Sequence, residues 1–160
     1  MDRIDSIINH PAFRENLRKN QEAEKDRHFC RHDISHFLDV ARIGLVISLE
    51  EGLNIERELI YGAALLHDIG RHMQYARGIP HEKASALIAP EILRDSGFDN
   101  EETSVIITAI LNHRNEVVAQ ENSLRGVLYR ADKASRPCYA CSAERECSWK
   151  DEKKNKSICY

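Results

Sequence analysis

Apolar residues recur along most of the chain at intervals of three and four, the spacing that places side chains on one face of an α-helix. The clearest stretches contain Phe37, Val40, Ala41 and Leu45, and then Leu124, Val127, Leu128 and Ala131. Strands would instead alternate apolar and polar residues. The pattern therefore predicts an all-α fold.

Capping and helix-stopping residues divide this pattern into six helices. They are expected over residues 11–25, 33–51, 55–68, 80–96, 99–113 and 123–135. Asn54 is expected to cap the third, and Pro90 to kink or interrupt the fourth. Residues 71–79 read as a loop because they contain Gly78 and precede Pro80.

The two ends of the chain differ from the middle. Residues 1–28 combine a polar leader with a heavily charged helix, and are expected to form an exposed or loosely docked helical arm. Residues 29–136 form the main helical domain. Residues 137–160 are rich first in Cys and then in Lys, without apolar periodicity, and form a short C-terminal appendage.

Composition narrows the class of protein. The chain has 160 residues, of which 42% are apolar, as expected for one domain with a sizeable core. Lys and Arg number 23 against 26 Asp and Glu, a net charge of -3, so nucleic acid is an unlikely partner. Apolar runs are far shorter than the roughly 20 residues that cross a bilayer, and the N-terminus lacks a secretory pattern. We expect a cytoplasmic protein with no membrane contact, and the oligomeric state stays open.

Polar groups of metal-binding type interrupt the apolar stripes. His36 is in line with Val40, and His67 and Asp68 end the apolar turn 63–66. Asp132 follows Leu128 on the buried face of its helix. Burying such groups unpaired is costly. A shared divalent ion, held by two imidazoles and two carboxylates from three helices, would satisfy all four.

The order of these residues resembles that of the HD superfamily of metal-dependent phosphohydrolases. The family pattern is a His, an adjacent His-Asp pair about thirty residues later, and a distant Asp. Here it reads His36, then His67-Asp68-Ile69-Gly70, then Ala131-Asp132-Lys133, and covers about residues 30–136. The resemblance implies an all-α HD-domain bundle over residues 29–136.

Two further histidines extend the comparison. His81 and His113 lie in the interval where HD proteins that bind two metals carry extra histidines. By resemblance, Asp68 would bridge two ions, one held by His36, His67 and Asp132 and the other by His81 and His113. Fe, Mn or Co would suit these ligands, and Mg or Zn would also be compatible.

The resemblance implies hydrolysis of a phosphoester or phosphoanhydride by a metal-activated water held beside Asp68. Arg71 is the favoured phosphate contact, although it also reads as a cation at a helix C-terminus. Lys133 adjoins Asp132 and would bind substrate or lie on a solvated face. His32, one turn before His36, would contact substrate or protonate the leaving group, or else lie at the surface.

The substrate is expected to be a small phosphorylated molecule, with a nucleotide preferred. Two other functions stay open at this stage. A His-rich, carboxylate-bridged pair of irons would also suit an HD-type diiron oxygenase. A sensor would bind a nucleotide or metal without turnover.

The cysteines suggest a second metal cluster. Cys138, Cys141 and Cys147 form a C-x2-C-x5-C pattern typical of zinc or iron–sulfur ligands. Cys30 lies six residues before His36 and Cys138 six after Asp132, so antiparallel helices would bring them together. Cys30 is therefore preferred to Cys159 as the fourth ligand of a structural zinc. Reduced thiols or an iron–sulfur cluster are the alternatives.

Overall fold

The computed structural model describes residues 2–160, and every regular element in that range is helical. The expected all-α fold is thus confirmed. The elements are α1 (Asp2–Asn9), α2 (Pro11–Ala23), α3 (Ile34–Glu50), α4 (Arg57–Leu66), α5 (Arg71–Arg77), α6 (His81–Asp95), α7 (Asn100–Asn112), η1 (Glu116–Gln120), α8 (Leu124–Ala134), η2 (Cys138–Ala140), η3 (Glu144–Glu146) and η4 (Asp151–Lys153).

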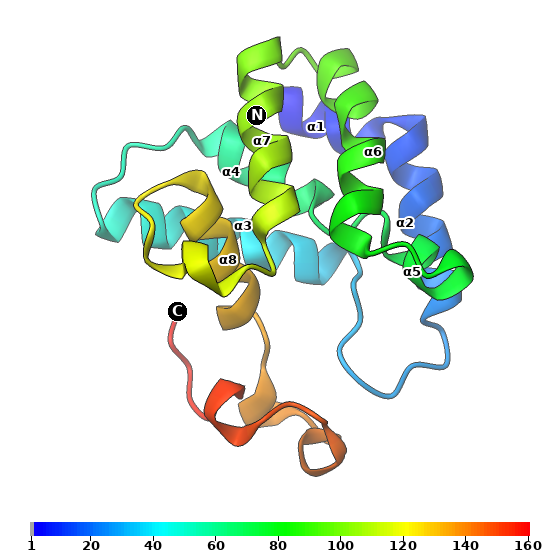
Figure 1. Cartoon of the computed structure of the whole chain (residues 1–160), viewed down its shortest axis with the longest axis vertical. Helices are drawn as coiled ribbons and strands as arrows, with labels where there is room; N and C mark the ends of the chain where they lie inside the picture. Colours follow the sequence, from blue (N-terminus) through cyan, green and yellow to red (C-terminus); the bar gives the residue numbers. More distant parts are fainter. Residues whose placement is uncertain (1) are drawn as a thin grey trace.

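Helix α4 lies at the centre of the bundle because nearly every face of it is apolar. Ile60, Ala63, Ala64, Leu65 and Leu66 are all buried. The helix packs against α3 on one side and against α7, α1, α8 and α6 on others. Its C-terminal end therefore delivers the next residues, 67 and 68, into the interior of the protein (Figure 1).

The N-terminal helices are part of the core. Ile4, Ile7 and Phe13 are buried in the same apolar cluster as α3 and α4. Helix α1 packs on α4 and α6, and α2 packs on α5 and α6. The expectation of an exposed arm is thus wrong. This stretch is mostly polar, but its three buried apolar side chains pack it against the bundle.

Three local expectations also fail. Residues 71–77 form α5 rather than a loop, and Gly78 ends that helix with φ of 68°. Helix α6 continues through Pro90, so the expected interruption is wrong, since packing against α5 and α7 outweighs one missing backbone donor, and the expected kink stays a prediction. Asn54 has φ of 52°, a left-handed conformation that an N-cap does not adopt, and the helix begins at Arg57 instead.

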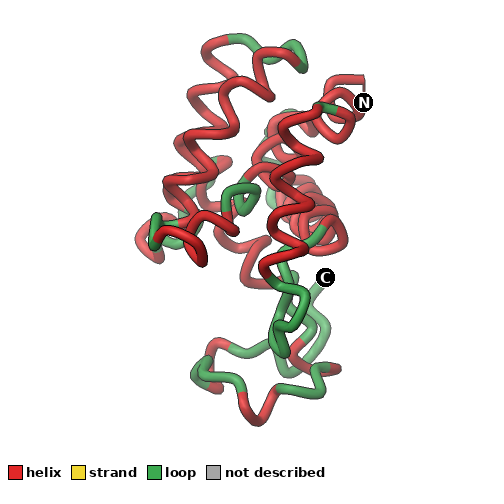
Figure 2. The backbone as a smooth tube through the Cα atoms, turned by 90° about the vertical axis from the view of Figure 1, so that its right-hand side faces the viewer, coloured by secondary structure: helices red, strands yellow, loops and turns green. Residues whose placement is uncertain are grey.

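The C-terminal segment, residues 137–160, leaves the bundle after α8. Figure 2 shows it as a mostly irregular extension at one end of the helical body, with only short turns of helix. Within residues 2–160, no helix has the length and apolar content that crossing a bilayer requires.

The buried position of Phe13 predicts a large effect of truncating it. Phe13→Ala should lower the free energy of unfolding by about 3–5 kcal/mol, as is typical of a fully buried Phe. Urea denaturation followed by circular dichroism measures this. Phe29→Ala, at a side chain that is 38% exposed, should cost much less. Equal small losses for both would mean that α2 is not part of the core.

Candidate metal centre

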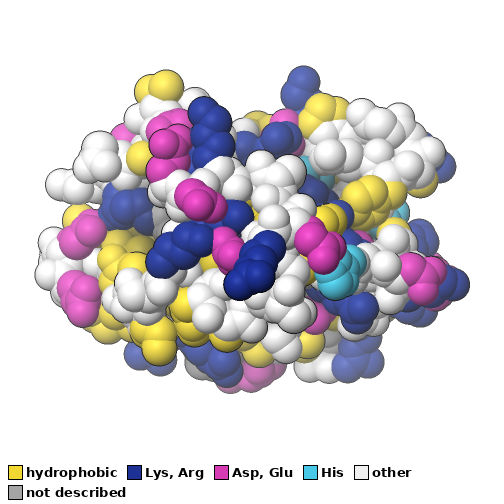
Figure 3. Space-filling model, turned by 90° about the horizontal axis from the view of Figure 1, so that it is seen from below, with side chains coloured by type: hydrophobic (Ala, Val, Ile, Leu, Met, Phe, Trp, Pro, Cys, Tyr) yellow, Lys and Arg dark blue, Asp and Glu magenta, His cyan; other side chains and the backbone are white. Residues whose placement is uncertain are grey.

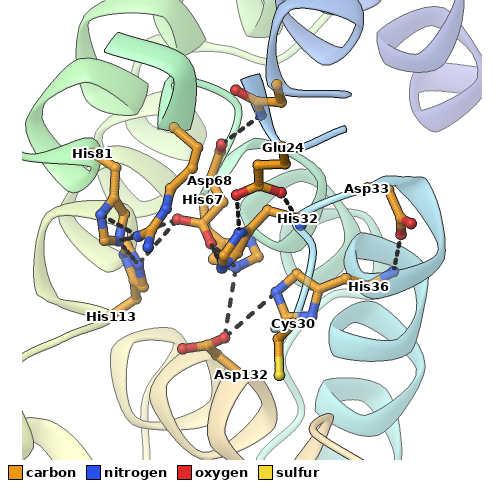
Figure 4. A network of polar contacts seen from close by, with 12 residues as sticks. Glu24, Cys30, His32, Asp33, His36, His67, Asp68, His81, His113 and Asp132 are labelled. Carbon is orange, nitrogen blue, oxygen red and sulfur yellow. Dashed lines mark hydrogen bonds and ion pairs between the residues drawn. The ribbon is translucent and has the colours of Figure 1, made fainter. Parts of the chain in front are cut away.

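The structure brings six of the predicted ligands together from five parts of the fold. His36 comes from α3, His67 and Asp68 from the turn after α4, and Asp132 from α8. His81 begins α6 and His113 follows α7. Figure 4 shows His81 and His113 on one side of Asp68 and His36 on the other.

These six residues form two groups of three. The ligand atoms of His36, His67 and Asp132 lie within 4.8 Å of one another, and so do those of Asp68, His81 and His113. In the first group, Asp132 Oδ1 lies 3.6 Å from His36 Nε2 and 3.8 Å from His67 Nε2. Each group thus presents nitrogen and oxygen atoms at a spacing that suits a shared cation.

Asp68 links the two groups through its two carboxylate oxygens. Its Oδ2 lies 3.4 Å from His67 Nε2 in the first group. Its Oδ1 lies 3.2 Å from His81 Nε2 and 3.6 Å from His113 Nε2 in the second. A carboxylate with one oxygen toward each group has the arrangement of a bridging ligand.

Backbone contacts fix the tautomers of two histidines. Nδ1 of His67 lies 2.6 Å from the Ala64 carbonyl oxygen, and Nδ1 of His113 lies 2.6 Å from that of Ile110. Because a carbonyl oxygen only accepts, each Nδ1 carries the proton and donates it. Each Nε2 is then left with a free lone pair, as in metal-binding histidines.

The centre is buried and contains polar atoms without partners. His36 Nε2, His67 Nε2 and Asp68 Oδ1 are inaccessible to solvent and make no hydrogen bond. Unpartnered buried polar atoms are rare and costly in proteins. The two Nε2 atoms face the first ligand group and Asp68 Oδ1 faces the second, so cations bound in the two groups would satisfy all three.

The protonation states agree with metal binding. Burial lowers the pKa of His67 to about 4 and that of His81 to about 3, and it also lowers the pKa of His36. These imidazoles are therefore neutral at pH 7, as ligands must be. His113 is the exception, because although burial opposes it, the negative charge of the adjacent Asp68 raises the pKa of His113.

The two carboxylates stay ionised although burial opposes it. Neighbouring histidines hold the pKa of Asp68 well below its ordinary value. Lys133, whose Nζ lies 2.5 Å from Asp132 Oδ2, is the main group that lowers the pKa of Asp132. Lys133 and Arg136 partly offset the charge of Asp132, and a bound cation would offset the buried charge of Asp68.

The turn between α4 and α5 is held in place from two sides. Ser85 Oγ of α6 accepts a hydrogen bond from Gly70 N at 3.0 Å. A Cβ at position 70 would lie 2.6 Å from Ser85 N, so only glycine allows this approach. On the other side, Asn20 of α2 donates to the Asp68 carbonyl at 2.9 Å and accepts from His72 N at 2.8 Å.

His32 lies inside the site rather than at the surface. It is 8% exposed, and its Nε2 lies 3.6 Å from Asp68 Oδ2. Its Nδ1 lies 2.6 Å from Glu24 Oε1, while its backbone N–H donates to Glu24 Oε2 at 2.7 Å. The surface alternative for His32 is therefore wrong.

Arg71 occupies the first turn of α5, so its interpretation as a cation at a helix C-terminus is wrong. Its Nη1 lies 2.6 Å from His81 Nδ1, close to the second ligand group. Lys133 is partly buried against Asp132 and also lines the adjoining cavity. It therefore does not lie on a merely solvated face.

Two supporting residues were not expected from the sequence. Glu24 is 2% exposed and also accepts a hydrogen bond from the Tyr75 hydroxyl at 2.6 Å. Gln74 Oε1 lies 2.6 Å from His81 Nδ1 and can hold its tautomer. Glu24 lies in a stretch that resembles an exposed charged helix, and Gln74 lies in the expected loop 71–79, so only their partners reveal them.

A cavity of about 830 Å³ opens beside the ligand groups. Arg71 and Gln74 of α5 line it, as the expected loop 71–79 would have done. Another part of its lining was not expected, because Phe29 of the loop before α3 and Trp149 of the C-terminal segment contribute to it. The C-terminal segment is therefore part of the candidate site.

The predicted cysteine cluster is not assembled at ligand distance. Among the residues that the structure describes, neither group with three ligand atoms within 4.8 Å contains a cysteine. All five thiols are free. The metal at Cys30, Cys138, Cys141 and Cys147 thus stays a prediction.

Comparisons with known proteins agree with this geometry. The HD domain family model matches residues 33–136. An uncharacterised protein of Clostridium beijerinckii is 46% identical over 160 residues, which is 100% of each chain. The crystal structure of a predicted HD superfamily hydrolase from an uncultured Thermotogales bacterium has a TM-score of 0.62 and 30% identity, and the match covers 90% of this chain and 82% of that chain.

The structure is an all-helical bundle with a buried centre of His and Asp side chains. The match of the family model over most of the chain shows that the protein belongs to the HD domain family. The expected resemblance is thus confirmed.

The buried carboxylate of Glu24 makes the stability of the fold depend on pH. Although burial opposes ionisation, hydrogen bonds from His32 and Tyr75 lower its pKa from 4.5 to about 2. A lowered carboxyl pKa stabilises the fold above pH 4.5, and this stability is lost as the pH falls toward 2. Urea denaturation should show that Glu24→Gln is less stable than wild type at neutral pH and that the difference shrinks below pH 4.5. Glu22→Gln, at an exposed position in the last turn of α2, should show little difference at any pH.

Proposed function

We propose that this HD-domain protein is a metal-dependent phosphohydrolase that acts on a small phosphorylated substrate, a nucleotide or a related phosphoester or phosphoanhydride. The observation that carries the proposal is Asp68, whose two oxygens face two separate sets of histidines beside a cavity with cationic walls. The name of the Thermotogales protein, a predicted hydrolase, supports the same class of reaction.

The donor set fits one or two divalent cations. His36, His67 and Asp132 would hold one, His81 and His113 the other, and Asp68 would contact both. When bound, such ions supply a metal-activated water and neutralise charge on the phosphoryl group. Fe, Mn or Co suits this mixture of imidazole and carboxylate, and Mg or Zn is compatible with it.

Arg71 and Lys133 bind the phosphoryl oxygens in this proposal. Both line the cavity, one beside each ligand group. Cations held there before the substrate arrives stabilise negative charge as it develops, at no cost of reorganisation. A guanidinium also binds two phosphate oxygens at once.

His32 protonates the leaving oxygen. Hydrolysis joins a water oxygen to phosphorus and breaks the bond to the leaving group, which then needs a proton. Glu24 accepts the Nδ1 proton of His32 and so fixes the orientation of the ring. Nε2 then faces the cavity beside Asp68 with a proton to donate.

The cavity has the size and charge of a nucleotide site. Ligand pockets typically enclose about 300–1,000 Å³, and this one encloses about 830 Å³. Beyond Arg71 and Lys133 it is lined by further cations, namely Arg27, Arg114, Arg136, Lys150 and Lys153. Figure 3 shows Lys and Arg side chains among acidic ones on the end where the C-terminal segment lies. Phe29, Tyr129 and Trp149 add aromatic surface on which a base can stack.

A single assay separates this proposal from the two other functions. The protein is purified without added metal, its metal content is measured, and it is given nucleotides, dinucleoside polyphosphates and a generic phosphodiester. Release of phosphate or of a phosphorylated product supports the hydrolase. Oxygen consumption by an iron-loaded protein selects the oxygenase, and a tightly bound ligand recovered intact selects the sensor.

Asp68→Ala tests the shared carboxylate. Metal content should fall, since both ligand groups lose an oxygen or its support, and kcat should drop by at least about 10³-fold. Elemental analysis and the phosphate assay measure the two effects. Asp39→Ala, at an exposed position of α3, is the matched control and should change neither. Full metal content in Asp68→Ala would contradict the bridging role.

Arg71→Gln tests the phosphate contact. Loss of a charged hydrogen bond of about 1.5–3 kcal/mol should lower kcat/KM by about 10- to 150-fold, while metal content stays at the wild-type level. Arg94→Gln, at an exposed position of α6, should behave as wild type. An unchanged kcat/KM in Arg71→Gln would exclude Arg71 from the substrate site.

A further inference from the structure

The C-terminal segment is folded although it contains almost no apolar core. Among residues 137–160, only Ala143 is buried. Its regular structure is limited to three short turns, η2, η3 and η4. Folding requires about 1–2 kcal/mol per residue to order the backbone, which buried apolar area normally offsets. This segment must be stabilised in another way.

Polar contacts attach the segment to the bundle at a few points. The Asn155 amide donates to the carbonyls of Lys133, Ala134 and Arg136 at 2.8, 3.2 and 2.9 Å, at the end of α8. The Arg136 guanidinium lies 3.5 Å from the centre of the Trp149 ring. Each such hydrogen bond contributes only about 0.5–1.5 kcal/mol.

The same segment meets the loop that precedes α3. His28 Nε2 lies 3.4 Å from Glu146 Oε2. Phe29 and Cys30 of the loop line one cavity together with Cys138 and Cys147. Two loops that are separated by about a hundred residues of sequence therefore bring their cysteines to one place.

The remaining thiol of the cluster, that of Cys141, is placed beside Cys138 by a local turn. Cys138 begins η2 and Cys141 directly follows it, and Cys141 N donates to the Cys138 carbonyl at 3.2 Å. This C-x2-C turn presents two sulfurs from one short stretch of chain, as structural zinc sites do. Cys159 does not line the cavity, and its Sγ contacts the carbonyl of Ser157 at 3.8 Å.

We propose that Cys30, Cys138, Cys141 and Cys147 bind a structural Zn²⁺ ion that fastens the C-terminal segment to the loop before α3. Each thiol loses its proton on binding, so four protons are released and the site carries a charge of -2 from four thiolates and one Zn²⁺. Two arginines offset that charge. Arg136 interacts electrostatically with Cys30, and Arg27 donates a hydrogen bond to the Cys30 carbonyl at 2.7 Å.

Binding requires the two loops to draw closer. In the described part of the chain, the sulfurs of no three cysteines lie within 4.8 Å of one another. Neither residues 24–33 nor residues 137–160 contain an α-helix that would resist this movement. The zinc would then hold Trp149 on the wall of the substrate cavity, beside Arg136, whose Nη2 lies 3.9 Å from Asp132 Oδ2.

Cobalt substitution tests this site separately from the histidine centre. The full-length protein is loaded with Co²⁺, and only sulfur ligation produces a thiolate-to-cobalt charge-transfer band. Wild type and Cys159→Ser should both show the band. Cys141→Ser should lose it, together with one equivalent of metal, while metal at the histidine centre stays in place. Absence of the band in wild type would overturn the proposal, and so would an unchanged band in Cys141→Ser.

Thiol titration keeps the proposal testable if Cys141→Ser does not fold. In zinc-loaded wild type, a thiol reagent should react at once with one of the five cysteines and with the other four only after a chelator is added. Five thiols that react at once would contradict the zinc site. Finding iron and acid-labile sulfide in the purified protein would also overturn the zinc site, because it would indicate an iron–sulfur cluster instead.

Discussion

The arrangement of the whole site depends on one carboxylate held in the interior with an oxygen toward each of two histidine pairs. Asp68 is buried, ionised and only partly hydrogen-bonded. An interior of low dielectric does not tolerate a second negative charge, that of Asp132, unless positive charge balances both. Cations in the two ligand groups would provide that balance, and the neutral imidazoles around them are in the state that binds metal.

The fold serves this carboxylate by surrounding a short turn with rigid elements. Helix α4, buried on nearly all sides, carries His67 and Asp68 inward, and Gly70 lets α6 approach closely enough to bring His81 alongside. Asn20 secures the turn from α2 through two backbone hydrogen bonds. Positions held by several independent contacts are the ones that keep ligand geometry fixed.

Much of this could be predicted from the sequence, because the informative residues break an apolar pattern. His36, Asp132 and the pair His67-Asp68 stand on stripes that should be buried, and this conflict indicates both the fold and the metal ligands. The N-terminal helices were misjudged for the opposite reason. Ile4, Ile7 and Phe13 are too few among charged neighbours to show periodicity, yet each is fully packed. Glu24 and Asn20 gave no signal either, since a polar residue in a polar helix looks exposed until its partner, far away in sequence, is known.

The wall of the cavity and the ligands of the centre come from different stretches of the chain. Loop 27–30 and residues 147–153 supply the outer wall, whereas the ligands lie between residues 36 and 132. The outer wall can therefore change in length or composition without disturbing the reactive groups. Related proteins that share the helical bundle would be free to diverge in what they admit while keeping the same chemistry.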